Sequence, residues 1–393
     1  MIKFLNLGLQ PLANSYLKKK KLSIKEKKFK LEIAFDKKNY LVSIVNTVPK
    51  EKMFNNTYPY KSSESKTMQK SFKDLTAKIK KYFKPKFIIE IGSNDGVFLK
   101  NFHKKLVVGV EPCDNLAKLT RIKNYITYSE YWSLKLAKKI TKNKKADLIY
   151  STNTLSHIKN LNEIFVAINF SLSDNGVLIL EDPSLLKCIE NVAYDQFYCE
   201  HIYVFSTIAL KNILDKHDLE IFDIHNTTTH GGSNRYYIKK KTNNMYKIKD
   251  SVKNEIKKEL KFGLHKITTY KKFSKKVKKS KKKLINIFQK LKKKKLKIIG
   301  YGATAKSCTV LNYCKIGNNF IDYFYDTTSY KVNKYLPGSK ILIKKYKKLN
   351  KKNTDVAFLG AWNFKDEIFK KEKNFIKDGG KFIMHVPNPR LIG

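Results

Sequence analysis

Short runs of apolar residues alternate with longer amphipathic stretches through much of the chain. Residues 87–91 form one such run, and comparable runs lie at 106–110, 146–150 and 176–180. Turn residues bound each run, and stretches with apolar residues at helical spacing lie between them. Alternation of strands and helices predicts an α/β fold, with a parallel sheet whose crossover connections are helices.

The alternation stops at residues 241–295, which are dense in lysine but keep apolar residues at helical spacing. This stripe predicts one or two exposed connecting helices and argues against a disordered basic linker. The strand pattern resumes at 296–302, and further strands are expected at 320–325, 356–360 and 381–385. The sequence therefore predicts a second, smaller α/β unit at the C-terminal end.

Composition narrows the possible functions. The 393 residues predict two or three domains, and the formal charge of +49 suits nucleic acid, an acidic substrate or a membrane surface. Only Arg121, Arg235 and Arg390 are arginines, however, and arginine is the usual reader of bases. Scattered lysines are typical of a solvated surface and of an A/T-rich genome. We therefore expect no nucleic-acid partner, although an RNA-binding role stays open on charge alone.

The five cysteines form no C-x-x-C pair, which favours reduced thiols and a cytoplasmic protein. No apolar run reaches the length of a membrane span, and the N-terminus lacks a secretory pattern, so stable membrane insertion is not expected. The sequence does not indicate an oligomeric state.

A glycine-containing turn, residues 90–96, follows the first strand and precedes a helix. Glycine allows a tight turn and close approach of a ligand, and the helix N-terminus offers free N–H groups. Glu111 ends the next strand, where a carboxylate accepts hydrogen bonds from ribose hydroxyls. The G-x-G-x-x-G spacing of dinucleotide sites is absent, and an acidic residue in the turn suits a cationic ligand such as S-adenosylmethionine. An ordinary turn is the alternative. The candidate cofactor-binding residues are Glu90, Gly92, Asn94, Asp95, Gly96, Glu111 and Asn153.

A phenol, a carboxylate and an imidazole lie within four residues at Tyr198, Glu200 and His201. A neutral imidazole works as a general base near its own pKa, so His201 is the leading candidate for proton removal. The alternative is a buried histidine whose hydrogen bonds are satisfied by the fold.

Several further segments along the chain contain distinctive combinations of residues. They include a leucine-, asparagine- and tyrosine-containing segment near the start, a tyrosine segment, an Asn-x-x-x-His element and an HGGS-x-R segment. The segments are 7–17, 58–63, 90–96, 153–157, 198–201, 230–235, 300–306, 336–338 and 361–364.

With these segments in view, the chain resembles the sugar C-methyltransferases that act on nucleotide-linked 4-keto-deoxy sugars, and the match runs nearly end to end. The resemblance implies a class I Rossmann-like methyltransferase domain that uses S-adenosylmethionine, a small N-terminal domain and a second, smaller Rossmann-like C-terminal domain. The expected parts are a small N-terminal domain at 1–72, a methyltransferase domain at 73–240, a helical connector at 241–295 and a substrate-nucleotide domain at 296–393.

The resemblance also implies a reaction. A proton leaves the carbon beside a sugar ketone, and the enolate attacks the methyl group of S-adenosylmethionine. His201 would be the base, Glu200 would orient it or hold a sugar hydroxyl, and Tyr198, His157 or Tyr60 would stabilise the oxyanion. Arg235 would hold either a substrate phosphate or a structural carboxylate. The expected substrate-binding residues are Tyr58, Tyr60, His230, Arg235, Tyr301 and Lys306.

The chain departs from the family pattern in two places. Two C-x-x-C pairs that bind a structural zinc in the family are missing; the chain starts too late for the first, and residues 36–39 replace the second. No metal is therefore expected, because structural zinc sites need four tetrahedral ligands. Cys199 stands where the family usually has histidine, which removes one possible proton carrier.

Three other functions stay open. An O- or N-methyltransferase on a related nucleotide sugar would need no base for a carbon-bound proton. An RNA methyltransferase would use the basic surface. A nucleotide-sugar-binding protein without activity would explain the missing zinc ligands, but retention of Tyr198, Glu200 and His201 argues against it.

Overall fold

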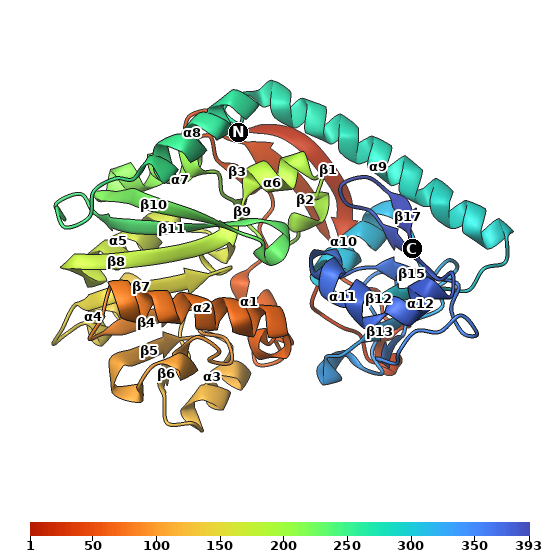
Figure 1. Cartoon of the computed structure of the whole chain (residues 1–393), viewed down its shortest axis with the longest axis horizontal. Coiled ribbons are helices and arrows are strands. Elements are labelled where there is room, and N and C mark those ends of the chain that lie inside the picture. Colours follow the sequence, from red (N-terminus) through yellow and green to blue (C-terminus); the bar gives the residue numbers. More distant parts are fainter.

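The computed structural model describes all residues from 1 to 393 and contains three β-sheets (Figure 1). The N-terminal segment forms an antiparallel sheet with the strand order β1-β2-β3-β9. β9 comes from the segment directly after His201, and Val204 pairs with Val42 of β3. The segment around His201 is therefore tied by backbone pairing to the N-terminal unit. The strands are β1 (Ile2–Gln10), β2 (Phe29–Phe35), β3 (Val42–Ile44) and β9 (Tyr203–Val204).

The central sheet has seven strands in the order β10-β11-β8-β7-β4-β5-β6. Strands β4 to β8 are parallel, and β11 runs antiparallel between β8 and β10. The strand order reverses beside β4, which places a ligand crevice at the carboxyl ends of β4 and β7. The strands are β4 (Ile88–Ile91), β5 (Val107–Val110), β6 (Ile126–Tyr128), β7 (Ala146–Thr152), β8 (Leu172–Pro183), β10 (Leu219–Thr227) and β11 (Ser233–Lys240).

Both faces of the central sheet are buried. Ile88 packs into the core on one face, and Ile89 packs into the core on the other. This explains why the strands read as continuous apolar runs rather than alternating ones. The helices associated with this sheet and with the entry to it are α1 (Lys50–Met53), α2 (Lys66–Tyr82), α3 (Asp114–Arg121), α4 (Leu134–Ile140), α5 (Leu161–Ser171), α6 (Leu185–Glu190) and α7 (Thr207–Leu214).

The C-terminal sheet has the order β14-β13-β12-β15-β16-β17, and only β17 is antiparallel. The predicted α/β class with two Rossmann-like units is therefore confirmed. The strands are β12 (Ile298–Tyr301), β13 (Phe324–Asp326), β14 (Ile343–Lys345), β15 (Val356–Leu359), β16 (Lys381–Met384) and β17 (Arg390–Ile392). The helices are α10 (Ala305–Cys314), α11 (Lys365–Lys371) and α12 (Lys373–Lys377).

Two helices lie between the central and C-terminal sheets: α8 (Asp250–Phe262) and the long α9 (Ile267–Lys293). Figure 1 shows α9 running along the edge of the molecule from the N-terminal sheet to the C-terminal unit. Its apolar stripe is buried, and Tyr270 contacts Phe4 of β1 at a ring distance of 5.0 Å. The helix therefore contributes to the core and is not only an exposed connection.

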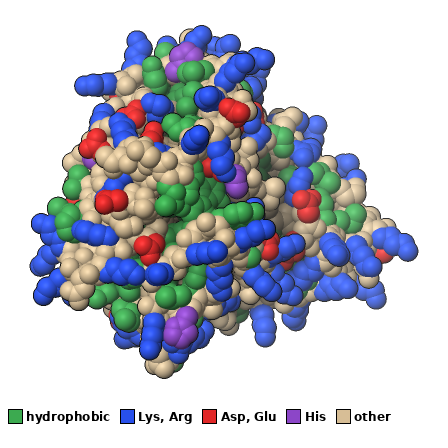
Figure 2. Space-filling model, turned by 60° about the vertical axis from the view of Figure 1, so that its left-hand side comes forward, with side chains coloured by type: hydrophobic (Ala, Val, Ile, Leu, Met, Phe, Trp, Pro, Cys, Tyr) green, Lys and Arg blue, Asp and Glu red, His purple; other side chains and the backbone are tan.

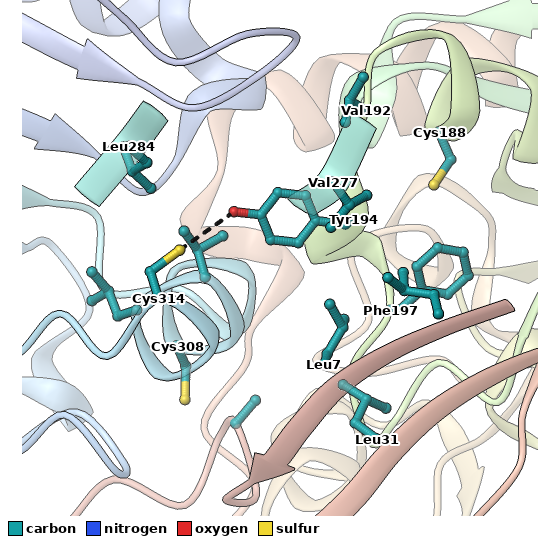
Figure 3. Close-up of a cluster of buried hydrophobic side chains, with 14 of the residues drawn as sticks. Leu7, Leu31, Cys188, Val192, Tyr194, Phe197, Val277, Leu284, Cys308 and Cys314 are labelled. Atoms are coloured by element: carbon teal, nitrogen blue, oxygen red, sulfur yellow. Dashed lines mark hydrogen bonds between the residues drawn. The ribbon is translucent and has the colours of Figure 1, made fainter. Parts of the chain in front are cut away.

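One apolar cluster joins residues from all three parts of the chain (Figure 3). Leu7 and Leu31 come from the N-terminal sheet, Tyr194 and Phe197 come from the segment before His201, and Cys314 comes from α10. The Tyr194 hydroxyl lies 3.8 Å from the Cys314 sulfur. Such a shared core holds the three parts of the chain in fixed positions relative to one another.

No helix of the structure combines the length and the apolar character that a membrane span requires.

Candidate active site

A cavity of about 1210 Å³ opens between the central sheet and the C-terminal unit. Its wall takes residues from the N-terminal unit, the central sheet region and the C-terminal unit, including Asn14, Tyr58, Glu90, His201 and Tyr301. Figure 2 shows a hollow lined by hydrophobic side chains, with a histidine at its edge and lysines around it. This volume lies above the usual range of about 300–1,000 Å³ for a small-molecule site and is enough for two ligands side by side.

One end of the cavity lies at the carboxyl ends of β4, β5 and β7. Gly92 adopts a positive φ of +77°, and a Cβ there would lie 2.8 Å from the Thr154 Cβ. Asn94 and Cys113 donate their backbone N–H groups to the Glu111 carboxylate at 2.9 Å each. Glycine at this position lets the turn fold closely over a ligand.

The hydrogen-bond acceptors at this end of the cavity fit S-adenosylmethionine. Glu90 Oε2 and Asn153 Oδ1 are buried and have no hydrogen-bond partner within the protein. Both atoms are acceptors beside the turn, and a buried acceptor without a partner is costly unless a ligand donor meets it. The cationic amino acid part of the cofactor carries such donors. Burial, followed by the charge of Glu111, raises the pKa of Glu90 well above its usual value.

Two predicted cofactor residues do not line the cavity. The Asp95 carboxylate accepts a hydrogen bond from the Ser63 N–H at 3.3 Å and another from the Ser63 hydroxyl. Gly96 has a φ of +79°, and a Cβ there would press against Thr120. The predicted contact between Asp95 and a cationic cofactor is therefore replaced by a structural one: the residue fixes the segment that carries Tyr60.

The cavity wall also includes residues that sequence reasoning missed. Ser129, Tyr131 and Trp132 follow β6 and line the cavity near the cofactor end. Trp132 is buried, and its indole Nε1 has no partner within the protein. Their position directly after β6 was the available signal, because the carboxyl end of β6 lies at the same edge of the sheet as the carboxyl ends of β4 and β5.

His201 lies in the middle of the cavity wall and is buried. Its Nε2 is 2.6 Å from the Tyr198 hydroxyl, and its Nδ1 is 2.8 Å from the Gln196 carbonyl oxygen. A carbonyl oxygen only accepts, so Nδ1 carries the proton and Nε2 is the acceptor for Tyr198. The geometry thus gives a neutral imidazole whose basic nitrogen faces a phenol on the cavity wall.

Burial keeps this imidazole neutral. Desolvation, followed by the nearby His157 and Lys306, lowers the pKa of His201 well below its usual value. Burial also lowers the pKa of His157 to about 4. The His157 ring stacks on the His201 ring at 5.0 Å, and its Nε2 has no partner within the protein. His157 therefore offers the cavity a second neutral imidazole.

Glu200 does not line the cavity and lies behind it. Its carboxylate accepts from Asn14 Nδ2 at 2.7 Å and from the Tyr58 hydroxyl at 3.0 Å. Burial raises the pKa of Glu200 to about 7, although these two hydrogen bonds oppose the shift. The predicted contact between Glu200 and His201 is not formed. Glu200 instead fixes Tyr58, and Asn14 gives the N-terminal segment a role that its sequence did not reveal.

Replacing Asn14 with alanine is expected to leave Glu200 Oε1 without its donor and to raise the pKa of Glu200 further. We expect a loss of about 1–3 kcal/mol in the free energy of unfolding, measured by urea unfolding at pH 8. The loss should be smaller at pH 5, where Glu200 is protonated. Asn6→Ala removes an exposed amide of the same unit and should cost less than about 0.5 kcal/mol. Equal losses for the two variants would contradict the prediction.

The predicted substrate residues fall into two groups. Tyr58, Tyr60, His230, Tyr301 and Lys306 line the cavity. Lys306 is buried and donates its Nζ to the His230 carbonyl oxygen at 3.0 Å. Burial, followed by the charge of Lys306, lowers the pKa of His230 to about 3.

Arg235 lies outside the cavity wall. Its Nε donates to Glu181 at 2.7 Å, and the side chains of both residues are buried. Of the two partners considered from the sequence, the structure favours the structural carboxylate and not a substrate phosphate.

Comparisons with known proteins agree with this arrangement. A family model for a methyltransferase domain matches residues 65–224, one for a C-methyltransferase C-terminal domain matches 228–387, and one for a zinc binding domain matches 1–54. The C-methyltransferase NovU of Streptomyces niveus is 26% identical over 393 residues, or 98% of this chain and 93% of its own.

Two solved structures show weaker similarity. A methyltransferase of Clostridium acetobutylicum that depends on S-adenosylmethionine is 14% identical, with a TM-score of 0.33 over 44% of this chain and 91% of its own. An O-methyltransferase of Brevibacillus brevis in complex with S-adenosylhomocysteine is 12% identical, with a TM-score of 0.35 over 48% of this chain and 84% of its own. The strand order of the central sheet defines the fold class.

The N-terminal unit does not fit a zinc ion. Residues 1–54 contain neither cysteine nor histidine. At the turn between β2 and β3, Asp36 accepts from the Lys38 N–H at 3.0 Å and from Asn39 Nδ2 at 2.7 Å. Side-chain hydrogen bonds of this kind hold a tight turn without a metal.

We expect purified protein to contain no stoichiometric zinc by elemental analysis, because no tetrahedral thiolate or imidazole set can form in this unit. Treatment with a chelator should leave the midpoint of thermal unfolding unchanged. A fall of several degrees after chelation would contradict the prediction.

The structure thus has the strand order and the cofactor turn of a methyltransferase domain. The matched C-terminal model and the relative that spans nearly the whole chain are those of C-methyltransferases. This chain is thus a methyltransferase that uses S-adenosylmethionine, and it is similar over nearly its whole length to C-methyltransferases.

Proposed function

We propose that the enzyme methylates a carbon atom beside the ketone of a nucleotide-diphosphate-linked 4-keto-deoxy sugar. The observation that carries the proposal is the hydrogen-bonded pair of His201 and Tyr198 on the wall of a cavity that also holds the cofactor turn. A base and an acid at 2.6 Å suit removal of a carbon-bound proton beside a ketone, because the carbon proton and the ketone oxygen lie close together.

His201 acts as the base. On substrate binding, the Tyr198 hydroxyl turns from Nε2 to the ketone oxygen and leaves the nitrogen lone pair free. The carbon-bound proton moves to Nε2, the C–H electron pair forms the enolate, and Tyr198 donates to the negative oxygen. Nδ1 keeps its proton throughout, because this N–H donates a hydrogen bond to the Gln196 carbonyl oxygen. The imidazolium that forms is stabilised by this same carbonyl.

The cofactor residues that line the cavity are proposed to hold S-adenosylmethionine beside this pair. When bound, S-adenosylmethionine supplies an electrophilic methyl group to the enolate carbon. Glu111 would accept from the ribose hydroxyls, and Glu90 and Asn153 would accept from the amino acid part. Gly92 and Asn94 would shape the turn that holds the methyl donor, and methyl transfer requires the donor to be held close to the attacked carbon.

The remaining parts are proposed to hold the substrate. His157 donates a second hydrogen bond near the ketone, and Tyr58 and Tyr60 close the sugar site. Lys306 and Tyr301 approach from the C-terminal unit, where a positive charge suits the diphosphate. Residues 296–393 would thus form the nucleotide side of the site, and residues 73–240 would form the cofactor side. Residues 1–72 would form a packing unit that carries Tyr58, and residues 241–295 would connect the two larger units.

The proposal is tested with a cofactor that carries a 13C-labelled methyl group. Product NMR should show the label bonded to a ring carbon adjacent to the ketone. A label bonded to oxygen or nitrogen would support the O- or N-methyltransferase instead. Transfer to RNA but not to the nucleotide sugar would support a nucleic-acid substrate.

In the Glu200→Gln variant, proton exchange at the same carbon should keep its rate from pH 8 to the acidic side of neutral pH. The pKa of His201 lies below its usual value, so the base stays unprotonated, and the rate falls only below about pH 6.5. A further change near pH 7 belongs to Glu200 and should vanish in Glu200→Gln. The check is the exchange rate in deuterated water between pH 5 and 8. A midpoint for the base at or above 6.5 would contradict the prediction.

A further inference from the structure

A buried carboxylate outside the cavity wall lies where the C-terminal unit meets the segment before His201. Asp195 is fully buried on the turn η6 (Tyr194–Gln196). Its Oδ2 accepts from the Trp362 indole at 2.6 Å and from His385 Nε2 at 3.0 Å. Trp362 follows β15 and His385 follows β16, so both donors come from the carboxyl ends of the C-terminal strands.

The surroundings of this carboxylate favour its charged form. Burial raises the pKa of Asp195, but His385, Lys306 and the Trp362 hydrogen bond outweigh burial and lower it below its usual value. A buried anion of this kind needs its donors, because an unpaired charge in the interior is strongly unfavourable. Two donors on one oxygen therefore fix the position of η6 relative to the C-terminal sheet.

The same turn sets the position of His201. Gln196 directly follows Asp195, and its carbonyl oxygen accepts from His201 Nδ1 at 2.8 Å. The Gln196 side chain donates to the His230 carbonyl at 2.7 Å, and Lys306 donates to that carbonyl at 3.0 Å. A shift of η6 would therefore move the atom that selects the imidazole tautomer.

Close packing restricts the position of the Trp362 side chain. A Cβ at Gly231 would lie 2.8 Å from the Trp362 Cζ3, so the indole is packed against the backbone of the His230 turn. Lys306 lies over the indole ring at 5.1 Å. On the other side of Asp195, Tyr194 is held in the shared core beside Cys314 (Figure 3).

We propose that Asp195, Trp362 and His385 form a clasp through which the C-terminal unit orients His201. These three are positioning residues, since none of them lines the cavity, Asp195 directly precedes Gln196, and Trp362 packs against the His230 turn. The clasp keeps the Gln196 carbonyl in place, and this carbonyl keeps the proton of His201 on Nδ1 and the lone pair on Nε2. A tautomer held by a second group in this way is the general requirement for an imidazole base. The link to catalysis rests on the proposed role of His201.

The test uses the full-length enzyme with four substitutions. Trp362→Phe removes one donor but keeps an aromatic ring, and His385→Leu removes the other. His385→Gln places an amide N–H close to the position of Nε2 and should restore the contact. Tyr270→Phe is the matched control, because it removes a buried hydrogen bond from α9 that has no link to η6.

Two measurements separate positioning from general loss of structure. The first is the rate of proton exchange in the sugar, analysed as kcat and KM. We expect Trp362→Phe and His385→Leu to lower kcat by at least about tenfold with KM changed less than about threefold. His385→Gln should recover most of kcat, and Tyr270→Phe should keep the wild-type value.

The second measurement is the 15N NMR spectrum of His201, which reports the tautomer without any substrate. The wild type should show the proton on Nδ1, and His385→Leu should show a mixture of tautomers. Wild-type tautomer and kcat in both donor variants, or a loss of kcat equal to that of Tyr270→Phe, would overturn the proposal. If the wild type exchanges no proton, the proposed function fails, while the tautomer spectrum still decides whether the clasp exists.

Discussion

Replacing His201 with asparagine is expected to lower the rate of proton exchange at the sugar carbon by about 10²- to 10⁴-fold, the usual contribution of a general base. The asparagine amide can still donate to the Gln196 carbonyl, which now accepts from Nδ1 at 2.8 Å. The substitution therefore removes the basic Nε2 with little disturbance of the segment. Methyl transfer should fall by a similar factor, because the enolate would no longer form.

The matched control is His217→Asn. His217 is also buried, but its ring packs against Phe165 at 5.9 Å, away from the cavity wall. This variant should keep the wild-type exchange rate. Thermal unfolding of both variants shows whether the fold is retained. Exchange within about threefold of wild type in folded His201→Asn would mean that another group takes the proton.

Replacing Gly92 with alanine is expected to weaken binding of S-adenosylmethionine by at least about tenfold. The residue has a φ of +77°, and a Cβ would lie 2.8 Å from the Thr154 Cβ and closer still to its hydroxyl. A left-handed backbone costs an alanine roughly 1–2 kcal/mol, and the contact with Thr154 adds to this. The turn should open and move the Asn94 N–H away from Glu111. Isothermal titration calorimetry measures the Kd directly.

Gly379→Ala separates the two causes. Gly379 also has a positive φ, +83°, but its Cβ would meet nothing within 4 Å. It should lose a similar amount of stability from the backbone and bind the cofactor as wild type does. Unchanged affinity in Gly92→Ala would show that the turn does not hold the cofactor.

The central part of the fold could be predicted from the sequence because its strands are buried on both faces. The runs at 87–91, 106–110 and 146–150 correspond to β4, β5 and β7, and they differ by only a residue or two at their ends. Continuous apolar runs bounded by turn residues give a clear signal. Strand β9 of the N-terminal sheet gave none, because it pairs with β3 from residues 203–204. Pairing across such a sequence distance leaves no local pattern.

Only part of the candidate site could be predicted, because some of its contacts leave no local pattern in the sequence. Side chains with their own chemistry, such as His201 and Tyr198, could be named from the sequence, and the structure brings them together. Gln196 could not, because it contacts His201 through its backbone carbonyl, which every residue has. Asp95 was assigned to the cofactor, and a substrate phosphate was one of two partners considered for Arg235, but Ser63 and Glu181 within the protein satisfy them. Their charge was visible in the sequence, while their partners depend on tertiary packing.

The most direct test of the account is proton exchange by the wild-type enzyme in deuterated water, with a 4-keto nucleotide sugar and without S-adenosylmethionine. Mass spectrometry and NMR follow the substrate. The account predicts that one deuterium enters at the carbon beside the ketone, at a rate that depends on enzyme concentration and on His201. Methylation of a ring carbon with no exchange under any condition, or exchange that persists in His201→Asn, would contradict it.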